Sequence, residues 1–572
     1  MNSSFARPTP STTERPVRAH GESVSFRRGG TEARAWRSIA RPAARRSIAR
    51  LLVALVVGAC SVCAHAGIAE AYAAGSRGDY ATALRELQPL ADQGDRDAQF
   101  AIGDMYSRGF GVPVDDAIAA RWFRKAADQG DARAQTNLGL FYEQGRGVAR
   151  DFDEAAKWYR KAADQGQATA QSNLSYMTLI GRGVAQSDVE AARLASLAAA
   201  QGLAVAQYRL GVFYTNGQGV GRDDAIALHW YKEAAVQGDA RAQSALGWVY
   251  GEGRGTARDP VESLRWLRLS AAQGDATAEH NLGMLLLNGR GAPREPVDAE
   301  RWIRKAAESG YAPAQVSLGL MYAAGDAVIA DEKQAVEWYR KAAAQGNASG
   351  QNNLGWMLTN GLGLPRDDAA AIRQFRLAAR KSNAFAMDNL GWMAEEGRGM
   401  PVDLAEAQKW YRLAEARGNA PARNHLALLA ARGKGMARDD VAAVNGFRAA
   451  AAQGLGPARH NLGYMVAKGL GTGAAPDRVA GLALQDLARE VGTPNPEDLP
   501  ALDPAALSPD ERARVAQLLA AFKSGPGVLV TLDSTLSAVG ATIGSPTVDG
   551  GSPAKSNGAD AGSVAAPSVV QR

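Results

Sequence analysis

The chain has 572 residues, of which 46% are hydrophobic and 22% charged, proportions typical of a soluble globular protein. Its formal net charge of +6 would suggest nucleic acid as a partner, but residues 1–50 hold eleven arginines and three glutamates, a net of +8. Subtraction leaves about −2 on residues 51–572, so the charge gives no support to nucleic-acid binding. The two cysteines, Cys60 and Cys63, both lie in the leader described next, so a chain without that leader has no thiol for a disulfide, a nucleophile or a metal site.

The N-terminal region has the parts of a secretory signal peptide in the expected order. The arginine-rich residues 41–50 precede the apolar run 51–59, and Ala64-His65-Ala66 follows as a cleavage site of the A-x-A type. We therefore predict that residues 1–66 are a basic extension and signal peptide, that cleavage follows Ala66, and that the protein is periplasmic or secreted.

Three alternatives stay open for this leader. Residues 57–60 (VGAC) resemble a lipobox, which would place a lipid on Cys60. The stretch 51–66 is a candidate uncleaved anchor, although its 16 residues fall short of the ~20 that a spanning helix needs. The pair Arg45-Arg46 suggests twin-arginine export, but the residues after it match that signal poorly. The first two alternatives would attach the protein to the outer or inner membrane.

A 36-residue period runs through most of the chain. The phrase QGxAxAQxNLGxxYxxGxGV recurs without insertion from position 94 to position 454. Such a period indicates a solenoid of stacked units, because one short unit cannot bury its apolar face alone. The anchor residues are Gly94, Gly130, Gly166, Gly202, Gly238, Gly274, Gly310, Gly346, Ser382, Gly418 and Gly454.

Each unit is predicted to hold two helices, here called helix A and helix B. In the unit from Gly130, helix A covers residues 131–144 and ends at Gly145, which can adopt the left-handed conformation found after helix C-termini. Helix B begins at Asp151, which with Glu154 forms the pattern of a capping box. The position of Ala134 is Ala or Gly in all eleven units, which indicates close packing between helices.

With these residues in view, the chain resembles the Sel1-like repeat family, a relative of the tetratricopeptide repeats. The resemblance implies an all-α fold, an α-solenoid superhelix of eleven 36-residue helix-turn-helix repeats with terminal capping helices. Three units depart from the pattern: one has Ser175 in place of Gly and Leu194-Ala195 in place of Trp-Tyr, one has Ser382 in place of the anchor Gly, and the last gains about two residues before Asp477. The matching residues are Ala134-Gln135, Asn137-Leu138-Gly139, Tyr142, Gly145-Arg146-Gly147-Val148, Asp151, Ala155 and Trp158-Tyr159-Arg160-Lys161-Ala162-Ala163.

The regions outside the repeats are short. We expect an N-terminal capping helix pair over residues 67–92 and the repeat solenoid over residues 93–490. Residues 491–525 are predicted to be a linker and a C-terminal capping helix, which begins at Ser508 with a capping box and an N1 proline. Residues 526–572 are rich in Gly, Ser, Ala and Pro and are predicted to be disordered.

Residue patterns for chemistry are not found in this sequence. The six histidines show no metal-binding spacing, and no H-E-x-x-H motif occurs. The Gly-x-Gly motifs follow helices, with no Gly-Lys-Ser/Thr, so they are helix ends and not phosphate loops. The recurring Asp residues are explained as helix caps. We therefore expect no catalytic residues, no metal and no small-molecule cofactor. The histidines are His20, His65, His229, His280, His425 and His460.

One face of helix A is a candidate surface for partners. At 100° per residue, the positions of Arg133, Thr136, Asn137 and Leu140 share a side away from the predicted core. Large apolar and aromatic residues recur there, and Trp and Tyr are frequent hot spots of protein interfaces. Packing between repeats is the competing interpretation. The candidate partner-binding residues are Arg133, Asn137, Tyr176, Tyr208, Trp248, Trp356, Trp392 and Tyr464.

The sequence thus predicts a non-catalytic protein–protein interaction scaffold or adaptor of the bacterial cell envelope. Its partners would be other proteins or peptides, bound on the concave helix-A face that related solenoids use. Two alternatives are a glycan- or cell-wall-processing enzyme and an envelope lipoprotein with a structural role in a secretion or export complex.

Overall fold

The computed structural model of the chain describes residues 67–473, 475–490, 492, 498–524 and 532. The signal peptide, cleavage after Ala66, the lipid site at Cys60 and nearly all of the tail over residues 526–572 lie outside these residues and stay predictions. The described part falls into two compact units, one that ends at Ala98 and one that begins at Gln99.

The first unit holds the residues for which a capping helix pair is expected. One helix covers residues 67–76, and α2 (Tyr80–Asp92) follows. Asp79 caps α2 by accepting the backbone N–H of Thr82 at 3.1 Å, and Leu87 is among the residues that α2 buries.

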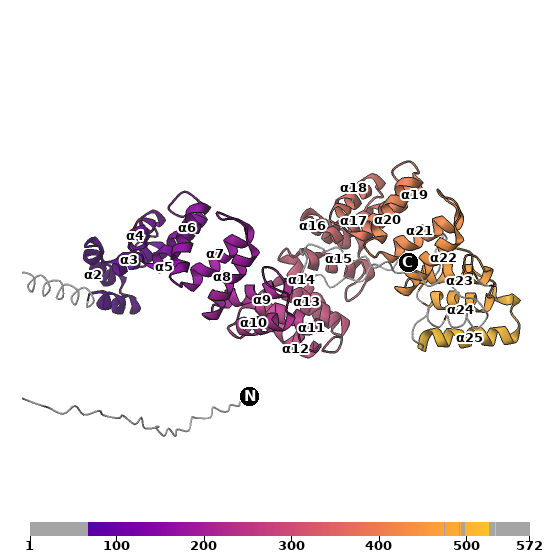
Figure 1. Cartoon of the computed structure of the whole chain (residues 1–572), viewed down its shortest axis with the longest axis horizontal. Coiled ribbons are helices and arrows are strands. Elements are labelled where there is room, and N and C mark those ends of the chain that lie inside the picture. Colours follow the sequence, from indigo (N-terminus) through magenta and orange to yellow (C-terminus); the bar gives the residue numbers. More distant parts are fainter. Residues whose placement is uncertain (1–66, 474, 491, 493–497, 525–531, 533–572) are drawn as a thin grey trace, which may run out of the picture. The chain divides into compact units, whose positions relative to one another are not determined.

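The second unit is built of antiparallel helix pairs that follow one another in chain order, and each pair contacts the next (Figure 1). The part of the chain described by the structure contains helices and no strand. The all-α solenoid that the sequence predicts is therefore confirmed. The remaining helices are α3 (Arg96–Arg108), α4 (Asp116–Asp128), α5 (Ala132–Gln144), α6 (Phe152–Asp164), α7 (Ala168–Ile180), α8 (Asp188–Ala200), α9 (Ala204–Asn216), α10 (Asp224–Val236), α11 (Ala240–Glu252), α12 (Pro260–Ala272), α13 (Ala276–Asn288), α14 (Pro296–Glu308), α15 (Ala312–Ala324), α16 (Glu332–Ala344), α17 (Ala348–Asn360), α18 (Asp368–Arg380), α19 (Ala384–Glu396), α20 (Leu404–Glu415), α21 (Ala420–Arg432), α22 (Asp440–Ala452), α23 (Gly456–Lys468), α24 (Arg478–Arg489), the 3-10 helix η1 (Pro504–Ala506) and α25 (Pro509–Ser524).

Local sequence sets the ends of each helix. Asp131 caps α5 by accepting the N–H groups of Arg133 and Ala134 at 2.9 Å, and Gly145 ends it in the left-handed conformation at φ +73°. Asp151 caps α6 in the same way.

The capping box predicted for Asp151 and Glu154 forms only by half. The N–H of Glu154 donates to Asp151 Oδ1 at 3.0 Å, but the Glu154 carboxylate pairs with Lys157. The N–H of Asp151 instead donates to the carbonyl of Tyr142, so this N–H already has an acceptor other than the Glu154 side chain. The reciprocal half of the prediction is thus wrong, because the turn between the helices already satisfies that N–H.

Buried glutamines join several repeats to the repeat before them. Gln135 on α5 accepts from Gln165 Nε2, beyond the end of α6, at 2.7 Å, and donates its own Nε2 to the carbonyl of Ala127 on α4 at 3.1 Å. One amide therefore connects three helices, and its burial makes both bonds hard to replace by water. We call this arrangement the glutamine ladder. Its other pairs are Gln99/Gln129, Gln171/Gln201, Gln207/Gln237, Gln243/Gln273 and Gln315/Gln345.

The C-terminal end of the repeats is covered by the chain itself. The N–H of Leu499 donates to Asn461 Oδ1 at 2.7 Å, and His460 Nε2 donates to the Leu499 carbonyl at 2.8 Å. Gln485, fully buried on α24, accepts the N–H of Leu502 at 2.8 Å. α25 packs on α24, and its predicted capping box between Ser508 and Glu511 forms in both directions.

Candidate functional site

The part of the chain described by the structure holds neither a metal-ligating cluster nor a membrane-spanning helix. No group of three or more His, Cys, Asp or Glu side chains in this part of the chain is placed to hold a metal ion. Among the same residues, no helix combines the length and the hydropathy needed to cross a bilayer.

The aromatic residues predicted on helix A lie on six different helices. They are Tyr176 on α7, Tyr208 on α9, Trp248 on α11, Trp356 on α17, Trp392 on α19 and Tyr464 on α23. Tyr176 is exposed, at 43% of its surface, whereas the other five are half-buried and pack against the cores of their repeats. Packing thus explains part of the stripe, and each ring keeps a partly exposed surface.

Guanidinium groups lie on several of these rings. Arg254 lies over Trp248 and Arg398 over Trp392, each with Cζ 4.8 Å from the ring centroid. The same two arginines pair with acidic residues of the preceding helix B, Arg254 with Asp224 at 3.1 Å and Arg398 with Asp368 at 3.2 Å. Each tryptophan is therefore held beside a fixed positive charge.

The N-terminal part of the face has the same character. Arg209 lies over Tyr176 at 5.4 Å and Arg241 over Tyr208 at 4.9 Å. Burial, and then the charge of Arg241, lower the pKa of Arg209 from its usual value, and Arg209 donates to the Ser172 carbonyl at 2.5 Å. Arg254 and Arg398 were not predicted as part of this face, although Arg recurs between the two glycines of the turn at Arg146, Arg182, Arg254, Arg290 and Arg398.

Arg133 and Asn137 occupy the same face on α5. Arg133 is exposed, pairs with Asp131 at 2.7 Å and lies over the ring of Phe100 at 4.3 Å. Asn137 is half-buried. Thr136, which the helical projection places on the outer side with them, is buried and donates to the Ala132 carbonyl, so that expectation is wrong.

The next repeat accounts for this burial. In several repeats the residue at the position of Thr136 bonds to the residue at the position of Asn137 one repeat later. His280 Nε2 lies 2.9 Å from Ser317 Oγ, and Asn389 donates to Asn352 at 3.0 Å. The helix-A face is thus partly a joint between repeats, which a projection of a single helix cannot reveal. The other pairs are Asp388/His425 and Asn424/Asn461.

His280 is the histidine most changed by this packing. It is almost fully buried, and its Nδ1 has no hydrogen-bond partner among the described residues. Burial lowers the pKa of His280 to about 4, so the ring is neutral at pH 7. The ring lies against Tyr311, the N-cap residue of α15, at 5.7 Å between centroids, and acts as a packing residue.

Comparison with one solved structure supports the fold. A structure from uropathogenic Escherichia coli, c5321, described as a protective antigen displaying an SLR fold, is 29% identical to this chain. The match covers 83% of this chain and 99% of c5321, with a TM-score of 0.56. A Sel1 repeat protein from Oxalobacter formigenes is 33% identical over 54% of this chain and 89% of its own, with a TM-score of 0.42. No curated protein matches the chain.

The family model for the Sel1 repeat matches eleven consecutive segments of the chain. Sel1 repeat proteins generally mediate protein–protein interaction, and their solenoid is typically a non-catalytic scaffold. The segments are residues 96–131, 132–167, 168–203, 204–239, 240–275, 276–311, 312–347, 348–383, 384–419, 420–455 and 456–484. The match spans more than half of the chain, and we conclude that this protein belongs to the Sel1 repeat family.

Proposed function

We propose that this protein is a non-catalytic scaffold of the bacterial cell envelope that binds other proteins through its helix-A face. The observation that carries the proposal is the row of half-exposed rings under fixed guanidinium groups. Trp, Tyr and Arg are the residues most often found as interface hot spots. Here the pairs Trp248/Arg254 and Trp392/Arg398 each present an aromatic ring and a guanidinium group side by side. Contacts within the chain hold the two side chains in place before a binding protein arrives.

Export rests on the leader sequence. A basic segment, the apolar run 51–59 and an A-x-A site support a cleaved signal peptide and a periplasmic or secreted protein. The uropathogenic Escherichia coli relative is described as a protective antigen, and we take this description as a second support for export. A lipid on Cys60 would instead hold the same scaffold at a membrane.

Capture of partners tests the binding proposal. The tagged full chain is crosslinked in cells and purified, and captured proteins are identified by mass spectrometry. The same is done for a Trp248/Trp356/Trp392→Ala variant. The control is Trp122/Trp302/Trp410→Ala, three half-buried tryptophans on helix B. We expect specific partners that the control keeps and the helix-A variant loses. Equal capture by both variants would overturn the assignment of the face.

Localisation is tested separately. Cells are fractionated, and the mass of the purified protein is measured for the natural chain and for Cys60→Ala. A periplasmic chain that begins at Gly67, unchanged by Cys60→Ala, is the expected result. A lipid-modified N-terminus at Cys60, lost in Cys60→Ala, would contradict cleavage after Ala66 and establish the lipoprotein. A cytoplasmic chain that keeps residues 1–66 would contradict export.

A further inference from the structure

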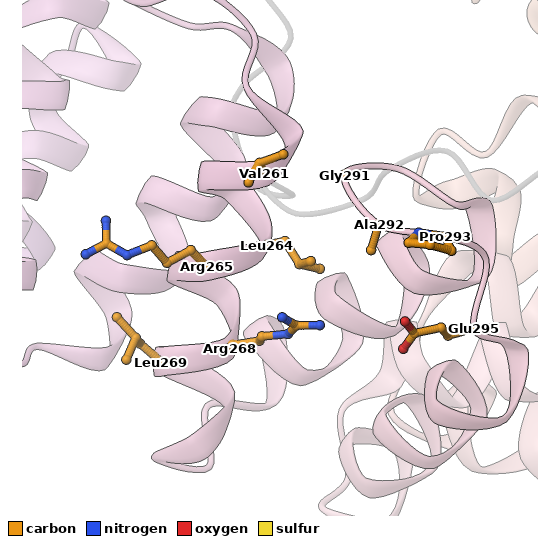
Figure 2. Close-up of a pocket in the computed structure, with 9 residues that line it drawn as sticks. All are labelled: Val261, Leu264, Arg265, Arg268, Leu269, Gly291, Ala292, Pro293 and Glu295. Atoms are coloured by element: carbon orange, nitrogen blue, oxygen red, sulfur yellow. The ribbon is translucent and has the colours of Figure 1, made fainter.

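A pocket of about 740 Å³ opens on the helix-B side, between α12 and the turn that precedes α14. Leu264 forms its buried floor, and Ala292 and Pro293 of the turn face it from the other side (Figure 2). Val261, at the edge, is exposed at 64% of its surface. The walls therefore present apolar surface to solvent, which favours an apolar side chain as the occupant.

Arg268 points into this pocket (Figure 2). The repeat pattern explains why its guanidinium group makes no polar contact with the described residues. At the same repeat position, Arg124 donates to the hydroxyl of Tyr142, and Arg304 donates to Tyr322 at 2.8 Å. The residue that corresponds to these tyrosines for Arg268 is Leu286, which is buried and has no hydroxyl. Within the described residues, no hydrogen bond or ion pair involves the Arg268 side chain.

Glu295 is the second charge at the pocket, and it too departs from the repeat pattern. Most other helix-B caps are Asp, whose short carboxylate bonds the first N–H groups of the helix. Glu295 stands at the cap of α14 and makes no such bond. Figure 2 shows its carboxylate turned toward the pocket, opposite Arg268, with no ion pair between them at 4.0 Å or less among the described contacts.

We propose that this pocket, the α12 pocket, binds a segment of a partner protein in which an apolar side chain lies between an acidic and a basic residue. The apolar side chain fills the space over Leu264. The carboxylate accepts from Arg268, and the basic group donates to Glu295. Charge complementarity selects this chemistry, since the pocket offers one unpaired cation and one unpaired anion on opposite walls of an apolar cavity. The α12 pocket is separate from the helix-A face.

Peptide selection tests the proposal directly. A library of twelve-residue peptides displayed on phage is selected on the full chain, and the affinity of recovered peptides is measured by fluorescence anisotropy. We expect recovered sequences that share an apolar residue flanked by Asp or Glu on one side and Lys or Arg on the other. Arg268→Glu should weaken their binding by roughly tenfold or more. Ala292→Trp, which fills the pocket without changing charge, should weaken it to a similar degree.

The matched control is Arg376→Glu, at the same repeat position on α18, where the arginine is also exposed. It should leave binding unchanged, as should the Trp248/Trp356/Trp392→Ala variant. Recovery of no sequence with the acidic–apolar–basic pattern would overturn the proposal. So would loss of binding in Arg268→Glu and Arg376→Glu alike, or loss in Arg268→Glu without loss in Ala292→Trp. Loss of binding in both arginine variants would indicate general attraction to positive charge. Loss in Arg268→Glu alone would indicate a site elsewhere on α12.

Discussion

The ring of Tyr159 lies directly on the backbone of Gly139, so that a Cβ added to this glycine would come within 2.8 Å of Tyr159 Cδ1. The glycine on helix A makes room for the ring on helix B of the same repeat. The glycine is replaced in two repeats, one with Ala427 facing Phe447 and one with Ser175 at the glycine position and the small Ala195 at the ring position. There the hydroxyl of Ser175 donates to the Ala191 carbonyl at 2.7 Å.

Gly139→Ala should therefore destabilise the protein by about 1–3 kcal/mol, the usual cost of overpacking a dense core. Tyr159 is fully buried and its hydroxyl donates to Glu143 at 2.8 Å, so the ring has little freedom to move away. Urea denaturation followed by circular dichroism measures the effect, and hydrogen exchange should place it in α5 and α6. An unchanged urea midpoint would contradict this account.

A double variant provides the internal control for that contact. Tyr159→Ala alone should cost about 3 kcal/mol because it leaves a cavity. Gly139→Ser with Tyr159→Ala copies the natural pair Ser175/Ala195 and should be more stable than the sum of its two single variants predicts. Strict additivity would show that the two positions do not share one space.

The ion pair between Glu279 and Lys305 replaces one step of the glutamine ladder. Glu279 is buried at the ladder position, and Lys305 Nζ lies 2.7 Å from it. Lys305→Ala would leave a buried carboxylate without its cation and should cost about 2–3 kcal/mol, less than for a fully buried pair because Lys305 is half exposed. Thermal and urea denaturation measure the loss.

Two variants separate this charge effect from simple truncation. Glu279→Gln restores the residue of the other ladder steps and should remove most of the penalty when combined with Lys305→Ala. Lys161→Ala truncates the equivalent lysine of α6, where the ladder residue is the neutral Gln135, and should cost less than Lys305→Ala. Equal losses for the two lysines would count against a buried charge as the cause.

His280 makes stability depend on pH. Its pKa falls from the usual 6.5 to about 4 in the folded protein because burial disfavours the charged ring. The unfolded chain therefore binds the proton more strongly, and stability should fall as the pH drops from about 6.5 toward 4 and then level off. The upper bound for this loss is about 3 kcal/mol. Urea midpoints at pH 7.5 and pH 5.0 should differ less in His280→Asn than in the natural chain, and an equal difference would rule out this residue.

Ser382 holds a backbone conformation that suits glycine. It stands at the anchor position with φ +63°, which costs a residue with a side chain roughly 1 kcal/mol. Ser382→Gly should therefore raise stability by up to about 1 kcal/mol, and Gly418→Ser, at the next anchor, should lower it by a similar amount. Gly418 has φ +79° and no atom within 4 Å of an added Cβ, so the comparison reports backbone strain alone. Changes of the same sign in both variants would contradict the explanation.

The sequence was enough to predict the helices, their caps and their number of repeats, because each depends on residues close together in the chain. Gly145, Asp151 and Ser508 end or cap their helices as predicted, whereas Asp131, expected inside helix A, is its cap. The contacts between repeats were harder to foresee. Gln135 reads as a surface residue in a single helix, although glutamine recurs both at its position and thirty residues later. That paired recurrence was a usable signal for the glutamine ladder.

The candidate face was only partly predictable for the same reason. The helical projection correctly places Thr136 and Arg133 on the same side of helix A. The next repeat, however, covers Thr136 and leaves Arg133 exposed. The α12 pocket was not foreseen at all. It depends on the replacement of a tyrosine by Leu286, and such a substitution within an apolar position carries no obvious sign of function.

The glutamine ladder has a consequence for how this protein can change in size. Every bond of the ladder lies within one repeat or reaches back to the repeat before it, so none spans the solenoid as a whole. Excision of residues 204–239 would bring Gln243 eight residues after Ala199, at the spacing that Gln207 now has. Duplication of the same segment would add one further identical joint. The number of repeats can therefore change during evolution by the gain or loss of whole repeats. The covering formed by Leu499 and Leu502 is needed only once, at the C-terminal end of the solenoid.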